Sequence, residues 1–287
     1  MYIALNNWVN GGKLNAYEFI DWAAAKGLDG VELTVGDQLP IDIACAECRR
    51  IAEHAKRKKV GLRTLASGSG WGCSLGAADA AERKQAADFL RKYIQIAQWI
   101  GAETVLVVPG ATRISFEPGH PELPYRLVWD NVTAEVKKLV PFIEEHQVNV
   151  GLENVWNRFL ISPMEWKLFL DQFKSDYVGI YFDAGNACIY GRAHDYPDLL
   201  GKYLKAVHLK NFQEQNSGGT LFDFTTDLFE GDLDYKALWQ ALQKVGYKGA
   251  MTVEMIPFSG KFTLGPDDKT LADKMARQIL ELKARLV

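Results

Sequence analysis

Short β-rich runs alternate with longer helical runs from one end of the chain to the other, and this alternation limits the folds that the chain can adopt. Several of the short runs are continuous Val, Ile and Leu, as expected for strands buried on both faces of a parallel sheet. The predicted strands are 2–6, 30–34, 60–66, 104–109, 148–153, 178–183, 206–210 and 250–255. The predicted helices are 16–27, 41–58, 80–101, 125–146, 162–173, 196–204, 234–246 and 268–287.

Eight consecutive strand–helix units favour a closed (β/α)8 barrel, the TIM barrel, over an open doubly wound sheet. No GxGxxG motif follows the first strand, which also argues against a dinucleotide-binding sheet. The 287 residues suit one barrel, and no linker divides them, so we expect a single domain over 1–287. In this fold the chemistry gathers where strands end.

The composition excludes several classes of protein. Lys and Arg total 33 against 36 Asp and Glu, a net charge of -3, so the chain has no overall basic field for nucleic acid or an anionic membrane. No run reaches the about 18 apolar residues that a membrane span needs. The start of the chain, MYIALNNWVNGG, lacks the basic and apolar regions of a signal peptide.

The four cysteines are too sparse for a disulfide scaffold. Cys45 and Cys48 form a CxxC inside a predicted helix, and a redox or zinc pair is the alternative to two ordinary helix residues. A second pair with similar spacing, which a zinc site would need, is absent from the sequence. We therefore expect a reduced protein in the cytoplasm.

Ionisable residues stand at the ends of four consecutive predicted strands. Taken one by one, each could be a solvated loop residue or a structural histidine. Together they predict one metal site, because adjacent strands lie about 4.8 Å apart and their ends meet. The four residues are Glu153, Asp183, His208 and Glu254. Three carboxylates and one imidazole suit Mn²⁺, which we favour, or Mg²⁺ or Co²⁺, and Zn²⁺ is possible.

Longer motifs around these residues resemble a known family. The runs ENVWNRFLISP, YFDAGNACIYG, AVHLKNF and LFEGDLDYKALWQALQKVGYKGAMTVEMIP are similar to the sugar-phosphate isomerase/epimerase group of the xylose-isomerase-like TIM barrels. This group includes ketose 3-epimerases, pentulose-phosphate 3-epimerases and hexulose-phosphate isomerases. The resemblance covers nearly the whole chain and is strongest from about residue 148 to 258.

The resemblance implies a metal-dependent reaction on a ketose or ketose phosphate. In that family the Glu, Asp, His and Glu at these strand ends hold one divalent ion. Carried over, Glu153 and Glu254 are also the catalytic acid/base groups on opposite faces of the sugar. The reaction passes through a cis-enediolate that the metal stabilises, and it gives either epimerisation at C3 or aldose–ketose isomerisation.

Two positions depart from the branch that epimerises free ketoses. That branch carries a Glu after an NRF run and a His three residues after the Asp of the sixth strand, whereas Leu160 and Asn186 stand here. Both changes favour the phosphorylated-sugar or uncharacterised branches. Asn186 can bind a substrate hydroxyl, or it can be an Asn tolerated in a left-handed turn after Gly185.

Three further residues are candidates for substrate binding. Lys210 lies two residues beyond His208 and so shares its face on a strand, where it can contact an enediolate or a phosphate, unless it is an ordinary loop lysine. Trp8 and Trp156 follow the first and fifth strands and can stack on a sugar or simply pack loops. Glu32 and Arg63 are interpreted as buried partners in the barrel and left out of the site.

Three other functions compete with the isomerase. Apurinic endonucleases of the same superfamily need many strand-end histidines, whereas one of the five here ends a strand, and the net charge of -3 opposes DNA binding. A metal-dependent dehydratase of the inosose or dehydroshikimate kind would use the same ligands. A non-catalytic sugar-binding barrel would not need them. The expected partner is a small sugar or sugar phosphate, without nucleic acid or membrane, and a homo-oligomer is left open.

Overall fold

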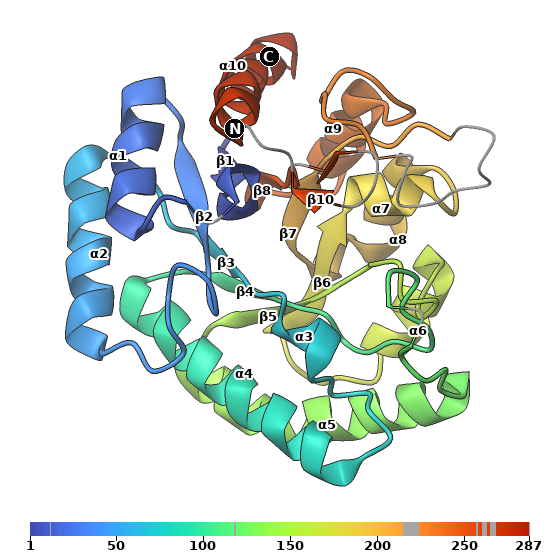
Figure 1. Cartoon of the computed structure of the whole chain (residues 1–287). Coiled ribbons are helices and arrows are strands. Elements are labelled where there is room, and N and C mark those ends of the chain that lie inside the picture. Colours follow the sequence, from blue (N-terminus) through green and yellow to red (C-terminus); the bar gives the residue numbers. More distant parts are fainter. Residues whose placement is uncertain are drawn as a thin grey trace.

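The computed structural model describes residues 1–11, 13–117, 119–214, 224–256, 258–259, 263–264 and 268–286. Eight parallel strands follow one another around a closed ring, in which the last strand pairs with the first (Figure 1). They are β1 (Ile3–Asn6), β2 (Gly30–Thr34), β3 (Thr64–Ala66), β4 (Thr104–Val107), β5 (Asn149–Glu153), β6 (Val178–Asp183), β7 (Leu204–Leu209) and β8 (Ala250–Val253). The predicted (β/α)8 barrel is confirmed.

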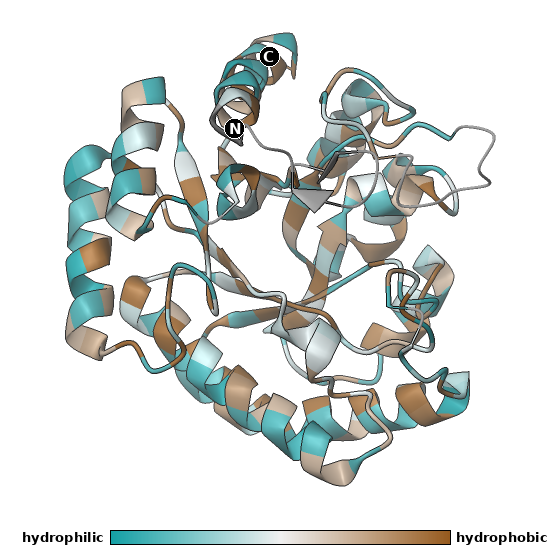
Figure 2. Cartoon of the chain, viewed as in Figure 1, coloured by the Kyte–Doolittle hydropathy of each residue, from teal (hydrophilic) through white to brown (hydrophobic). Residues whose placement is uncertain are grey.

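Helices surround the ring, one in each of the predicted helical runs (Figure 1). They are α1 (Ala16–Lys26), α2 (Cys45–Lys58), α4 (Ala80–Ile100), α5 (Tyr125–His146), α6 (Pro163–Leu170), α8 (Tyr196–Leu200), α9 (Tyr235–Lys244) and α10 (Asp268–Leu286). Figure 2 shows mixed polar and apolar residues along α4 and α5, as expected for helices with one face on the strands and one toward solvent. Val287, the end of the last predicted helix, lies outside the described residues.

Short elements decorate the ends of the strands. Those that the sequence analysis did not predict are η1 (Asn7–Asn10), α3 (Ser69–Gly72), α7 (Ala184–Cys188), η2 (Ala193–Asp195), β9 (Phe258–Ser259) and β10 (Thr263–Leu264). The 3-10 helix η3 (Gly201–Tyr203) follows α8 within the predicted helical run 196–204. Among the longer helices, α1 shows how the sequence sets the two ends of a helix. Asn15 and Glu18 form a capping box at its start, and Gly27 takes a left-handed conformation just past its end.

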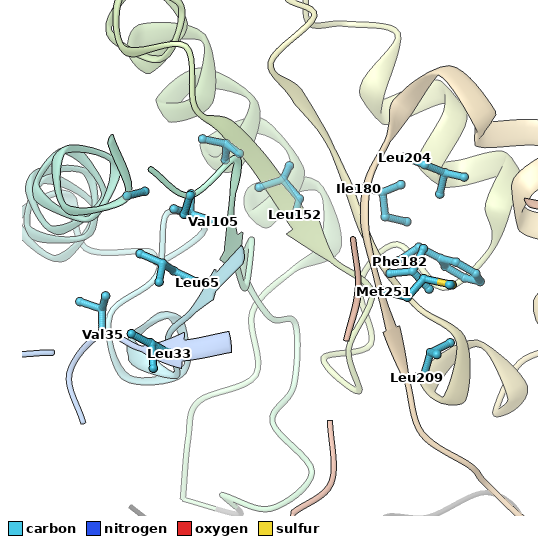
Figure 3. Close-up of a cluster of buried hydrophobic side chains, with 14 of the residues drawn as sticks. Leu33, Val35, Leu65, Val105, Leu152, Ile180, Phe182, Leu204, Leu209 and Met251 are labelled. Atoms are coloured by element: carbon cyan, nitrogen blue, oxygen red, sulfur yellow. The ribbon is translucent and has the colours of Figure 1, made fainter. Parts of the chain in front are cut away.

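Alternate residues of each strand face opposite sides of the barrel wall. The outward residues pack with the helices in one large apolar core, and Figure 3 shows part of it, including Leu33, Leu65, Leu152, Phe182 and Met251. A separate small cluster of Ala66, Leu106, Tyr181 and Ala206 lies inside the barrel. Most other inward residues near the strand ends are polar and buried: Asn6, Glu32, Thr64, Glu153, Asp183, His208 and Thr252.

Strand β3 is shorter than predicted, and this changes the place of Arg63. It begins at Thr64 rather than at residue 60, so Arg63 precedes the strand. The Arg63 guanidinium lies 2.7 Å from Glu103 and stacks over the ring of Tyr2. The interpretation of Arg63 as a buried partner of Glu32 is therefore wrong. Charge pairing draws Arg63 to the opposite end of the barrel from the metal-ligand candidates.

The structure also bears on the cysteines and on membrane-spanning helices. All four cysteines are free, and burial raises the pKa of the Cys48 thiol to about 11. A raised pKa keeps the buried Cys48 thiol protonated near neutral pH, and a protonated thiol is a poor nucleophile. Within the described residues, no helix has both the length and the apolar character of a membrane span.

Candidate metal and active site

Strand alternation carries the four predicted metal ligands to one place. Asp183 and His208 are register partners on β6 and β7, and Glu153 and Glu254 lie at or just past the ends of β5 and β8. Their outward neighbours Leu152, Phe182, Leu209 and Val253 belong to the core, so the ligand candidates point inward. One ligand atom of each of the four lies within 4.8 Å of those of the others, and all four residues are buried.

Hydrogen bonds hold Asp183 with one oxygen toward this cluster. Asn154, just past the end of the neighbouring strand β5, accepts from the Asp183 backbone N–H and donates to its carbonyl oxygen, both at 2.8 Å. Asp183 Oδ1 caps α7 by accepting from the Asn186 backbone N–H at 2.7 Å. Asp183 Oδ2 is buried and accepts no hydrogen bond from the described residues. The Lys210 ammonium lies 2.8 Å from this oxygen and compensates part of its charge, and a bound cation would compensate more.

His208 completes the cluster with its Nδ1 atom. This nitrogen lies 3.3 Å from Glu153 Oε1, 3.8 Å from Asp183 Oδ2 and 3.9 Å from Glu254 Oε2. Three carboxylates and a neutral imidazole are an ordinary ligand set for a divalent ion. The four ligand atoms and their spacing therefore fit a single divalent metal ion.

Lys210 supplies a positive charge to the same group. Its Nζ lies 2.8 Å from Asp183 Oδ2, without hydrogen-bond geometry, and it donates to Glu254 Oε2. The ammonium also lies over the rings of Trp156 and Phe224, at 5.6 and 5.2 Å from their centroids. Lys210 therefore faces the site, as its spacing from His208 predicts, although β7 ends one residue earlier.

The two glutamates have different electrostatic surroundings. Burial, with the negative charges of Glu254 and Asp183 nearby, raises the pKa of Glu153 to about 7. Burial also opposes ionisation of Glu254, but the positive charges of Lys210 and His208 together outweigh it and lower the pKa of that carboxyl. The pKa values of these two neighbouring carboxyl groups are therefore shifted in opposite directions.

A cavity of about 430 Å³ opens above the cluster. The predicted residues Trp8, Trp156, Asn186 and Lys210 line it together with Glu153 and Glu254. The sequence analysis missed other lining residues, among them Asp37, Ser67 and Phe116 from loops and Trp71 from the short helix α3. Trp71 packs edge-on against Phe116 at 4.9 Å and stacks near Trp156 at 6.5 Å, so aromatic rings form one wall.

Of the two residues that depart from the free-ketose branch, Asn186 lines the cavity and Leu160 does not. Asn186 lies in helix α7, so the left-handed turn considered for it is wrong. Its side chain accepts from Trp156 Nε1 at 2.6 Å and donates to the Asn154 carbonyl at 2.8 Å. Leu160 has a positive φ of 55° and packs in the apolar core, away from the cavity lining.

Glu32 is the buried residue beside the cluster that the sequence analysis left out of the site. It lies on β2, and its Oε1 is 2.8 Å from His208 Nε2. Only its position on a strand, with the same inward parity as Asn6 and Thr34, could have indicated that it faces the interior. Nothing local indicates which residue it meets across the barrel.

Comparisons with known proteins place the chain in a family. The family model described as xylose isomerase-like TIM barrel matches residues 20–279, and the chain belongs to this family. One relative is the SgbU protein of Escherichia coli (strain K12), which its name assigns provisionally to the L-ribulose-5-phosphate 3-epimerases. It is 24% identical over 248 residues, which cover 81% of this chain and 81% of SgbU.

Solved structures share the fold at low sequence identity. D-psicose 3-epimerase of Clostridium cellulolyticum H10, determined with D-tagatose, is 15% identical with a TM-score of 0.80, over 100% of this chain and 99% of that one. The IOLI protein, determined with a bound zinc atom, is 16% identical with a TM-score of 0.77, over 100% of this chain and 98% of that one. These likenesses show the barrel fold.

Proposed function

We propose that this protein is a divalent-metal-dependent sugar isomerase or epimerase that acts on a ketose or a ketose phosphate. The observation that carries the proposal is the convergence of three carboxylates and an imidazole from four consecutive strands at the base of one cavity. The names of SgbU and of the psicose epimerase support the same class of reaction.

The proposed metal ligands are Glu153, Asp183, His208 and Glu254. We favour Mn²⁺, with Mg²⁺, Co²⁺ and Zn²⁺ as alternatives, because the donor set is mainly carboxylate oxygen. When bound, such an ion stabilises the negative charge that develops on a substrate oxygen after a proton leaves the carbon beside a carbonyl.

The two glutamates move the proton in this proposal. They enter the cluster from β5 and β8, with β6 and β7 between them, so each can serve one face of the substrate. One removes the proton from the carbon beside the carbonyl, and the other returns a proton to the opposite face. Their oppositely perturbed pKa values support this division, because acid/base pairs commonly have surroundings that separate their protonation states.

The cavity walls would orient the substrate. We propose that Trp8 and Trp156 stack on the sugar, that Asn186 helps to fix Trp156, and that Lys210 faces the developing enediolate or a phosphate. Lys210 is already paired with two carboxylates, so its charge is directed to the reacting end of the cavity.

The test is a screen of ketoses and ketose phosphates with Mn²⁺-loaded protein in D₂O, followed by NMR and mass spectrometry. We expect deuterium at a carbon beside the carbonyl: at C3 for an epimerase, and at C1 or C2 for an isomerase. Matched pairs such as a pentulose and its 5-phosphate decide whether phosphate is required. Irreversible loss of water with a product absorbing in the ultraviolet would establish the dehydratase instead, and no exchange in any substrate would refute the proposal.

Three further predictions about the whole protein stay open: a single domain over 1–287, a cytoplasmic location and a homo-oligomer. An exposed apolar surface bears on the homo-oligomer. Met164 and Leu168 lie one helical turn apart on α6, and their side chains are 61% and 64% exposed. Ile161, just before α6, and Leu199, on the contacting helix α8, are also exposed. Light scattering of the wild type and of Leu168→Glu would test whether a second copy covers this surface.

A further inference from the structure

The barrel interior contains a carboxylate for which the proposed reaction has no role. Glu32 on β2 is completely buried, and its side chain crosses the barrel to residues of β6 and β7. Its Oε1 lies 2.8 Å from His208 Nε2 and accepts from Asn6 Nδ2 at 2.7 Å. Its Oε2 accepts from the Tyr181 hydroxyl. Both oxygens are therefore partnered, and His208 is the one proposed metal ligand among the partners.

The orientation of His208 gives this contact its importance. A neutral imidazole has a lone pair on one nitrogen and a proton on the other. His208 Nδ1 faces the three carboxylates of the cluster, so it must carry the lone pair to bind a cation. The proton then belongs on Nε2, which is the nitrogen that points at Glu32.

We propose that Glu32 is a positioning residue for metal binding, which holds the His208 proton on Nε2 and aims Nδ1 at the ion. This inference rests on the metal centre of the proposed function. An imidazole that donates its second N–H to a carboxylate is also a stronger donor to a metal, so the charge of Glu32 contributes as well as its hydrogen bond.

A purely structural role for Glu32 is the competing explanation. A buried carboxylate with satisfied oxygens can tie strands together regardless of any metal. The two roles differ in which hydrogen bond matters. If Glu32 acts through His208, removal of the Tyr181 hydroxyl should affect metal binding little. That change leaves the contact between Glu32 and His208 Nε2 in place, and it keeps an aromatic ring at residue 181, whose centroid lies 4.4 Å from that of the His208 ring.

The experiment compares Glu32→Gln, Glu32→Leu and the matched control Tyr181→Phe with the wild type. The first readout is the dissociation constant for Mn²⁺, measured by competition with a chelating dye. The second is the pair of ¹⁵N shifts of the His208 ring in Zn²⁺-loaded protein, assigned with His208→Ala, which report the nitrogen that binds the metal and the one that carries the proton.

We expect Glu32→Leu to weaken Mn²⁺ binding by about 10- to 100-fold and to disturb the His208 pattern. Glu32→Gln, whose amide oxygen can still accept from Nε2, should lose less affinity and keep the wild-type pattern. Tyr181→Phe should stay within about 3-fold of the wild type. If Glu32→Leu does not fold, a loss in Glu32→Gln that exceeds that of Tyr181→Phe still supports the proposal.

Two results would overturn it: wild-type affinity in both Glu32 variants, or an equal loss in Glu32→Gln and Tyr181→Phe. Because metal binding is measured without substrate, these results leave the proposed reaction standing. Conversely, a wild type that binds Mn²⁺ normally but exchanges no carbon-bound proton refutes the reaction alone. A wild type that binds no divalent ion refutes both.

Discussion

The outer and inner faces of the same barrel strands are built in opposite ways. On the outer face, Leu152 and Phe182 join an apolar core that packs against helices. One residue further along each strand, Glu153 and Asp183 face a buried polar interior. Because the side-chain direction alternates with every residue, a barrel can separate the source of its stability from the site of its chemistry. A substitution on one face should then leave the other face largely unchanged.

The separation has an energetic cost on the inner face. Three carboxylates share a small buried space, and burial raises the pKa of Asp183 as well as that of Glu153. Lys210 and His208 offset part of this repulsion, and the proposed ion would offset more. The predictions below test the independence of the two faces, from the largest expected effect to the smallest.

Removing an inner-face ligand should abolish activity and spare the fold. Asp183→Asn and His208→Ala should each lower the rate of proton exchange by about 10³-fold or more, because a lost Lewis acid removes several kcal/mol of transition-state stabilisation. Metal content by elemental analysis should fall in parallel. A cooperative melt close to that of the wild type is the control. Activity that survives chelation and desalting in both variants would contradict the metal-centred hypothesis.

Changing the glutamates should separate the two proton-transfer roles. Glu153→Gln and Glu254→Gln keep the side-chain size, and each should slow net epimerisation by about 10²- to 10⁴-fold. Provided that metal content is retained, each variant should still exchange the proton of one epimer, and the two variants should prefer opposite epimers. Deuterium wash-in from both epimers measures this. The same epimer preference in both variants would argue against a two-base reaction.

Truncation of an outer-face side chain should lower stability and spare metal binding. Leu152→Ala removes a completely buried side chain beside Glu153, and it should lower the free energy of unfolding by about 2–5 kcal/mol. Mn²⁺ affinity should change little in the protein that remains folded. Leu280→Ala, at a position that is 43% exposed, is the matched control and should stay within about 0.5 kcal/mol of the wild type. A large loss of metal affinity in Leu152→Ala would mean that the faces are coupled.

Metal removal should lower the free energy of unfolding, because the carboxylates of the inner face then lose a compensating charge. Mn²⁺ at about 100 times its dissociation constant should raise the free energy of unfolding by about 2.7 kcal/mol, because the ion binds the folded chain preferentially. Thermal melts with Mn²⁺ and with a chelator measure the shift. Asp183→Asn should lose the shift and keep a melt of its own. An equal shift in that variant would place the ion elsewhere.

The smallest effect is expected at the cavity wall. Trp156→Phe keeps an aromatic ring but removes the N–H that donates to Asn186 Oδ1. Loss of one hydrogen bond, worth about 0.5–1.5 kcal/mol, should raise KM by about 2- to 10-fold with kcat nearly unchanged. Steady-state kinetics measure both parameters. A fall in kcat larger than the rise in KM would place Trp156 in the chemical step rather than in substrate binding.

The sequence by itself determined the barrel, because apolar runs of strand length alternate with amphipathic runs and the pattern repeats eight times. It also predicted that Glu153, Asp183, His208 and Glu254 come together. Neighbouring strands in a parallel barrel meet at their ends, so position along the chain is sufficient to infer proximity between adjacent strands.

Only the tertiary structure decided which residues meet across the barrel or between loops. Glu32 reaches His208 from a strand that is not its neighbour, and that distance depends on how the ring closes rather than on any local pattern. Trp71 enters the cavity from the short helix α3 and Phe116 enters it from a loop, and the periodicity of strands and helices does not encode where these segments run. Leu160 lies in the core because its loop has positive φ angles at Arg158 and Leu160. Arg and Leu rarely adopt such angles, so the sequence does not indicate this turn.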